Sequence, residues 1–177
     1  MYVSIPTRPN GIGLAWDPQN PSFGFTIVCP VVVLREEIND DDIEVLQFQV
    51  YSSKTGEWRV SENVSDFRVP SLDFLPRRFL GVYAGKKRVY WSLIDHIMWF
   101  DIEKDVAGLI NIPHHCNFVH PNMNLTNTEI GICNGEVSYS RMTKRGDLEI
   151  WLLREKDDDK FEWLKKQTIG LQLAKNS

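Results

Sequence analysis

The sequence predicts an all-β protein made of repeated four-stranded units. Three observations support this fold class. Short runs of β-branched and aromatic residues alternate with turn residues, no long amphipathic helical pattern occurs, and a strand–turn–strand pattern recurs at intervals of about 50 residues. The 177 residues are enough for one domain with a substantial core, so we expect a single domain over residues 1–177.

The first unit, residues 11–70, contains four expected strands. Asp-Pro and Asn-Pro dipeptides follow the first strand and the acidic segment REEINDDD follows the second, as is typical of loops. The turn SSKTG joins the last two strands, and we expect Tyr51 to face the core and Trp58 to be buried between units. The four sequences are GIGLAW at 11–16, GFTIVCPVVVL at 24–34, IEVLQFQVYS at 43–52 and EWRVS at 57–61.

The second and third units, residues 78–113 and 127–173, each supply four more expected strands. Ala-Gly-Lys-Lys, Asn-Gly and Asp-rich turns separate these strands. In the second unit the strands are FLGVYA at 79–84, RVYWSLI at 88–94, HIMWFDI at 96–102 and AGLINIP at 107–113. In the third unit they are EIGICNG at 129–135, EVSYSRM at 136–142, LEIWLLRE at 148–155 and FEWLKKQTI at 161–169.

The units correspond to one another in sequence. Gly81 aligns with Gly131 at a shift of 131 − 81 = 50 residues, and Tyr51 aligns with Phe100 at a shift of 100 − 51 = 49. A four-stranded antiparallel sheet cannot bury both apolar faces alone, whereas similar sheets stacked around an axis cover them, with glycines in the crowded centre. The period is that of kelch-like β-propeller blades. About three blades do not complete a ring, so we expect an open propeller.

Charge and hydropathy exclude several classes of partner. Lys and Arg total 20 and Asp and Glu total 24, so the formal net charge of −4 gives no reason to expect nucleic acid or an anionic membrane as a partner. No run reaches the ~20 apolar residues of a membrane helix, and the N-terminal segment lacks a signal-peptide pattern. Because Cys29, Cys116 and Cys133 do not describe a disulfide framework, we expect a soluble protein of the cytoplasm or nucleus.

The residues with reactive side chains do not form a catalytic, cofactor or metal site in the sequence pattern. His114, His115, Cys116 and His120 carry the atoms of a zinc site, but adjacent residues on a strand point to opposite faces and no second ligand pair follows. We therefore interpret this segment as a loop between blades. Cys133 lies inside a repeated strand, where we expect a buried and inert side chain.

Two charged segments also have structural explanations. The acidic segment REEINDDDIE lacks the glycine that a calcium loop needs. The segment GKKR at 85–88 lies at an expected hairpin tip, where charge protects a sheet edge and aids solubility. Neither a phosphate-binding loop nor a nucleophile elbow is present. We expect no enzymatic activity and no cofactor, and the pattern does not indicate which residues bind a partner.

Four segments, in this order along the chain, carry a resemblance to a known family. They are GIGLAWDPQNPSFGFTIV, EVLQFQVYSSKTGEWR, GVYAGKKRVYWSLIDHIMWFDIEKDVAGLINIP and EIGICNGEVSYSRMTKRGDLEIWLLREKDDDKFEW. Together they cover most of residues 11–169 and resemble the F-box-associated, kelch-type β-propeller region of plant F-box proteins. The second segment resembles that region's Val-Tyr-Ser-Ser-x-Thr-Gly-x-Trp strand pair.

The resemblance implies a protein-interaction module that recognises the target protein of a ubiquitin ligase. The family's amino-terminal F-box helices bind a Skp1-type adaptor. They have no counterpart in this sequence, so we do not expect this chain to recruit the adaptor. One alternative is a truncated propeller fragment that acts only by associating with a related propeller. Another is a propeller-fold glycosidase, but Asp40 to Asp42 and Asp157 to Asp159 cluster in turns rather than on inner strands.

Overall fold

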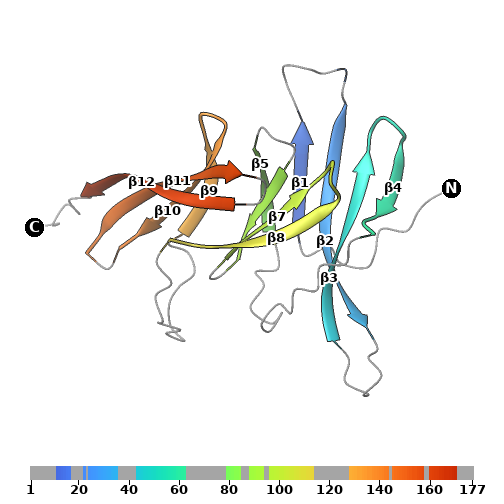
Figure 1. Cartoon of the computed structure of the whole chain (residues 1–177), viewed down its shortest axis with the longest axis horizontal. Coiled ribbons are helices and arrows are strands. Elements are labelled where there is room, and N and C mark those ends of the chain that lie inside the picture. Colours follow the sequence, from blue (N-terminus) through green and yellow to red (C-terminus); the bar gives the residue numbers. More distant parts are fainter. Residues whose placement is uncertain are drawn as a thin grey trace, which may run out of the picture. The chain divides into compact units, whose positions relative to one another are not determined.

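The structure of the chain, a computed structural model, consists of strands and turns (Figure 1). It describes residues 11–16, 22, 24–35, 43–62, 79–84, 88–93, 96–113, 128–143, 145–157 and 160–170. Within these residues no α-helix occurs, and so none that could cross a membrane. The strands are β1 (Gly11–Trp16), β2 (Phe25–Arg35), β3 (Ile43–Ser52), β4 (Glu57–Val60), β5 (Phe79–Ala84), β6 (Arg88–Ser92), β7 (His96–Asp101), β8 (Val106–Asn111), β9 (Thr128–Cys133), β10 (Glu136–Met142), β11 (Asp147–Asp157) and β12 (Lys160–Gly170).

The strand bounds confirm the expected all-β fold and agree with the expected strands to within two residues at each end. They form three four-stranded meanders, which we call the first blade (β1–β4), the second blade (β5–β8) and the third blade (β9–β12). The first two share one sheet, in the order β4-β3-β2-β1-β5-β6-β7-β8, and the third is a sheet of order β12-β11-β10-β9. The chain divides into two compact units, Met1–Ile110 and Asn111–Ser177.

The inner strands β1 and β5 join the first two blades by parallel pairing, with Gly13 opposite Gly81. A Cβ atom added to Gly81 would lie 2.8 Å from Val89 Cγ1 and 2.9 Å from the Gly13 Cα atom. Both distances are shorter than real Cβ contacts, so only glycine allows the two inner strands to approach this closely. The expected role of glycine at a crowded centre is confirmed at these two positions.

Strand β2 contains a proline in its interior, where a missing N–H group normally disrupts a ladder. Pro30 pairs with Phe48 of β3 on one side. On the other side, the pairing of β2 with β1 extends only from Phe25 to Val28. Because Pro30 lies beyond that ladder, the strand tolerates it, and the β-branched residues around it keep the segment extended.

The core of the compact unit Met1–Ile110 lies between the first and second blades. The ring of Phe48 on β3 stacks on Phe100 of β7, with ring centroids 4.6 Å apart, and lies 6.0 Å from Trp91 of β6. All three side chains are fully buried. Each blade therefore covers an apolar face of the other, which is the stacking that the repeat predicts. The buried cluster consists of Ala15, Val28, Leu46, Phe48, Val50, Val89, Trp91, Met98 and Phe100.

The hairpin turns of the two blades confirm the repeat at atomic detail. The Gly56 amide donates to the Ser52 carbonyl at 2.8 Å, and the Asp105 amide donates to the Asp101 carbonyl at 2.9 Å. The two donor residues are 105 − 56 = 49 positions apart in the sequence, and the two acceptor residues are also 101 − 52 = 49 positions apart. Gly56 and Asp105 also share a positive φ, 71° and 56°. The two turns are equivalent positions of one structural unit.

The third blade has a small core of its own. Val137, Tyr139 and Leu153 are buried, and the Tyr139 ring lies 5.8 Å from the ring of Trp163. Asn134 and Gly135 both have positive φ, 53° and 80°, which allows a two-residue hairpin between β9 and β10.

The predictions that Tyr51 faces the core and that Trp58 is buried between units are wrong, because both side chains are half-buried and neither lies between the first and second blades. Tyr51 is opposite Trp58 in the ladder, so both point to the same side of the sheet. Val50 and Phe48 on the same strand point to the other side, into the core. Side chains alternate along a strand, so Tyr51 and Trp58 must face away from the second blade.

We predict that Phe48→Ala lowers the free energy of unfolding by about 3–5 kcal/mol, because it opens a cavity in the aromatic cluster between the blades. Trp58→Ala should cost at most about 2 kcal/mol, since that side chain is only half-buried. Urea denaturation followed by circular dichroism measures both values. Equal losses for the two variants would contradict the assignment of the core to the Phe48 side of the sheet.

Candidate functional site

The described residues contain no group of three or more His, Cys, Asp and Glu side chains that could hold a metal ion. His114, His115, Cys116 and His120 lie outside the described residues, as do Asp40 to Asp42, Asp158 and Asp159. Cys29 is buried, and this burial raises the pKa of its thiol, which makes it a poor nucleophile. The described part of the chain thus offers no metal cluster.

The prediction that Cys133 is buried is wrong. The residue ends β9 at the tight hairpin to β10, and its side chain is exposed. The short Asn-Gly turn places this end of the strand at the tip of the hairpin.

Arg88 also differs from the prediction that the GKKR segment is an exposed, solubilising tip. Its side chain is 3% exposed, and Arg88 Nε donates to Asp101 Oδ2 at 3.0 Å. The guanidinium lies over the Trp99 ring, 4.5 Å from the ring centroid. The other Asp101 oxygen accepts hydrogen bonds from the Glu103 and Lys104 amides. The pair therefore anchors the β7–β8 turn and is a structural group.

A second ion group lies in the third blade. The Glu149 carboxylate accepts hydrogen bonds from Lys165 Nζ at 2.6 Å and Arg141 Nε at 2.8 Å. The Lys165 ammonium also lies 5.4 Å from the centroid of the Trp151 ring. The hydrogen bond from Lys165, followed by that from Arg141, holds the pKa of Glu149 below its usual value. Both oxygens of the carboxylate are bound within the blade, so this group stabilises the sheet.

The SSKTG turn between β3 and β4 has a structural role as well. Ser53 Oγ accepts a hydrogen bond from the Phe25 amide at 2.7 Å, and the Ser53 amide donates to the Phe25 carbonyl at 3.0 Å. The turn is thereby attached to the beginning of β2. Ser52 Oγ accepts from the Lys54 amide, and Gly56 closes the turn with a positive φ.

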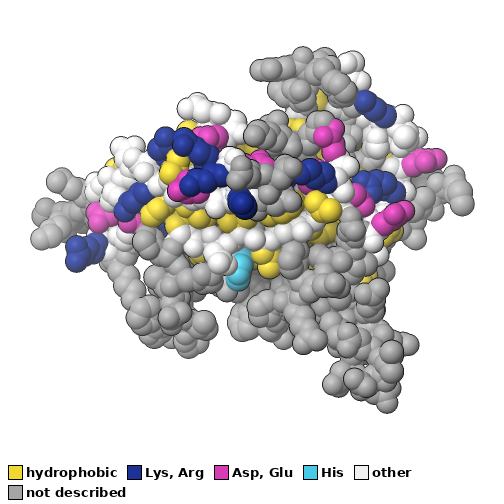
Figure 2. All heavy atoms as spheres, in the orientation of Figure 1, with side chains coloured by type: hydrophobic (Ala, Val, Ile, Leu, Met, Phe, Trp, Pro, Cys, Tyr) yellow, Lys and Arg dark blue, Asp and Glu magenta, His cyan; other side chains and the backbone are white. Residues whose placement is uncertain are grey.

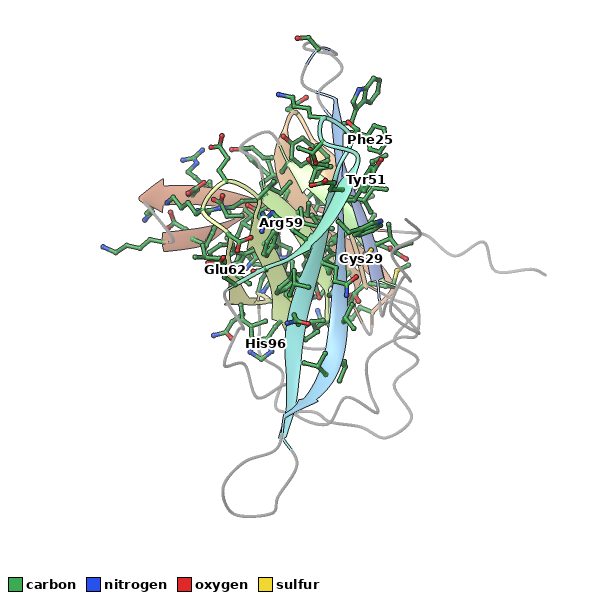
Figure 3. All side chains as sticks on the ribbon, turned by 90° about the vertical axis from the view of Figure 1, so that its right-hand side faces the viewer. Phe25, Cys29, Tyr51, Arg59, Glu62 and His96 are labelled. Carbon is green, nitrogen blue, oxygen red and sulfur yellow. The ribbon has the colours of Figure 1, made fainter. Side chains whose placement is uncertain are left out.

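One cluster that the sequence did not reveal connects the outer parts of the first two blades. The Asp105 carboxylate accepts hydrogen bonds from the Arg59 side chain, from Ser61 Oγ at 3.1 Å and from the Glu62 amide at 3.1 Å. Arg59 and Glu62 lie on the same side of the β2–β3 ribbon in Figure 3, opposite Phe25 and Tyr51. We call this cluster the Asp105 clamp. It holds the β3–β4 hairpin of one blade against the β7–β8 turn of the other.

Exposed charged side chains occur on the β3–β4 turn, on β4 and just after it, and on the β7–β8 turn, and we call this set the turn surface. Three are basic and three are acidic, and on the right-hand side of Figure 2 the dark-blue and magenta side chains are intermixed. A mixed surface of this kind suits a protein partner with complementary charges better than a polyanion. The turn surface consists of Lys54, Glu57, Arg59, Glu62, Glu103 and Lys104.

A second exposed feature is apolar and lies on the side of the first blade that faces away from the second blade. We call it the open face. Its most exposed side chains keep between 40% and 53% of their surface accessible. They are Ile12, Leu14, Trp16, Phe25 and Val60, with Ile27, Tyr51 and Trp58 packed between them at half burial. Contiguous apolar surface of this kind marks a contact surface for another molecule.

We predict that Asp105→Gly destabilises the chain by about 1–3 kcal/mol, because it removes the carboxylate that accepts the hydrogen bond of the buried Ser61 hydroxyl. Glycine keeps the positive φ, as Gly56 does in the equivalent turn, so the loss reports the hydrogen bonds rather than backbone strain. Asp105→Asn is the control and should cost less. Urea denaturation measures both, and an unchanged Asp105→Gly variant would contradict the clamp.

We predict that Glu149 contributes stability that depends on pH. Its folded pKa is lowered, so the contribution is complete above the ordinary glutamate value of ~4.3 and is lost as the pH falls through that value towards the lower folded pKa. Glu149→Gln should be less stable than the natural chain at pH 7, and the difference should narrow between pH 5 and pH 3. Urea titrations at each pH test this, and a constant difference would contradict it.

A family model described as F-box protein At3g26010-like, beta-propeller, matches residues 22–176. No curated protein matches the chain. The family match spans most of the three blades, and it confirms the resemblance that the four sequence segments carry.

Proposed function

Because the chain belongs to the F-box protein At3g26010-like β-propeller family, we propose that it recognises a target protein, as the substrate-recognition part of a ubiquitin-ligase subunit does. Propellers of this family are protein-interaction modules, and the family membership supports that general function directly. The target and the ligase connection are the parts that we propose.

The turn surface is the observation that carries the proposal. It combines side chains from two blades, and the Asp105 clamp attaches β4 and the two residues after it to the β7–β8 turn. A rigid arrangement loses little conformational entropy on binding, so alternating charges can select one partner by complementarity. We therefore assign target recognition to this surface.

An enzymatic function is not favoured by the described carboxylates. The two buried ones, Asp101 and Glu149, are each bound to cationic side chains. A glycosidase needs two facing carboxyl groups that are free to exchange a proton and attack or activate water. The sequence-based expectations of a location in the cytoplasm or nucleus, and of no nucleic-acid or membrane partner, stay predictions.

We predict that the double variant Lys54→Glu, Lys104→Glu recovers at least about tenfold less target protein than the natural chain, because reversing two charges disrupts the charge complementarity of the turn surface with its partner. Quantitative affinity capture from cells, followed by mass spectrometry, measures the recovery. Lys160→Glu, Lys166→Glu is the matched control, since it makes the same charge change at exposed residues of the third blade.

Two results would overturn the proposal. One is that no protein is recovered specifically, relative to an unrelated protein of equal net charge. The other is that both double variants recover the same amount of the captured protein, which would place recognition away from the turn surface.

A further inference from the structure

The open face of the first blade is a continuous apolar layer that spans four strands. Leu14 of β1 is opposite Ile27 of β2, Ile27 is opposite Tyr51 of β3, and Tyr51 is opposite Trp58 of β4. Residues opposite one another in a ladder point to the same side of a sheet. The four side chains therefore form one row across the whole blade.

A second row runs beside the first and makes the surface aromatic. Trp16 is opposite Phe25, and the Phe25 ring lies 6.0 Å from that of Tyr51. The Tyr51 ring in turn lies 5.3 Å from that of Trp58. Because these rings pack on one another, their positions are fixed before any partner binds, which lowers the entropic cost of association.

The repeat shows what kind of surface this is. Tyr51 of the first blade corresponds to Phe100 of the second, and Phe100 packs on Phe48 of the first blade. The face of the second blade that corresponds to the open face is thus covered by the strands of another blade. The open face has the same strand positions and the same apolar character, so its natural cover is also a β-sheet.

Two features determine which sheet fits. None of the described side chains on the open face is charged, so a copy of this face can approach another without repulsion or the burial of an unpaired charge. The second feature is the turn between β3 and β4. In the second blade the equivalent turn carries Asp105, which binds the first blade. The first blade has Gly56 at that position, and a Cβ atom there would meet no neighbour.

A blade from another copy could stack on the open face as the first blade stacks on the second, which is a head-to-tail contact. Because Gly56 has no carboxylate, such a contact would lack the hydrogen bonds that Asp105 makes between the first two blades. Head-to-tail contacts between copies also continue indefinitely unless the rotation closes. A two-fold contact of the open face with itself closes at two copies and needs no such clamp. We propose that two copies of this chain associate through their open faces, sheet on sheet.

The size of the face sets the strength that we expect. Four strands ~4.8 Å apart and about six residues long at ~3.3 Å per residue give a face of about 400 Å² in each copy. The two copies together bury about 800 Å² by this measure, which is below the range of standard interfaces. The dimer should therefore form at high protein concentration and dissociate on dilution.

Sedimentation equilibrium of the whole chain over a concentration series tests the proposal. The natural chain should approach twice the monomer mass as concentration rises. Leu14→Lys should stay monomeric throughout, because it would bury an unpaired charge in the contact between the two open faces. Leu14 is half exposed, so the variant should keep its circular dichroism spectrum and thermal midpoint. Thr55→Lys, which adds the same charge to the exposed turn of the same blade, is the control and should dimerise as the natural chain does.

A mixing experiment distinguishes the two-fold contact from other covers. Leu14→Lys and Leu14→Glu should each be monomeric alone and should dimerise when mixed, because opposite charges meet only if each open face contacts the other. A natural chain that stays monomeric at the highest concentration would overturn the proposal. So would a Leu14→Lys variant that still dimerises, or a mixture that behaves like its separate components, since either places a different surface on the open face.

Discussion

The packing of the first blade against the second depends on the contact of Phe48 with Phe100 and Trp91. A four-stranded meander has two apolar faces and no helix to cover them, so it is stable only when another sheet lies against it. In this chain the second blade covers one face of the first. The close approach of Gly13 and Gly81 and the Asp105 clamp both act on this contact, one at the inner strands and one at the outer turns.

The polar groups of the structure are arranged around that packing. Asp101 binds Arg88 with one oxygen and the amides of the following turn with the other, so the ion pair that is buried also shapes the β7–β8 turn. That turn presents Asp105 to the first blade. A change at Arg88 would therefore be expected to act on the contact between the blades even though its own partners lie within the second blade. The charged turns, the buried pair and the aromatic cluster are parts of one arrangement.

Much of the fold could be predicted from the sequence because its signals are local or repeated. Alternation and turn residues located the strands, and the shift of 49 residues between Tyr51 and Phe100 is matched by equivalent hydrogen bonds in the two turns. The errors concern which face is covered. Alternation shows that Trp58 and Val50 point to opposite sides, but not which side meets a neighbour. Arg88 was misread because its partner Asp101 lies 13 residues away, on the next strand. The Asp105 clamp joins residues more than 40 apart and left no pattern.

The parallel pairing of β1 with β5 determines how the first two blades unfold. It joins Gly11 to Phe79, which are 79 − 11 = 68 residues apart, so this ladder has a high contact order and must form after a long loop is closed. The backbone hydrogen bonds of the inner edge of one blade are made by the other blade. Neither blade can then lose its inner strand without exposing amides of its neighbour. In hydrogen exchange the two blades should behave as a single foldon, with β1 and β5 protected by the same opening reaction.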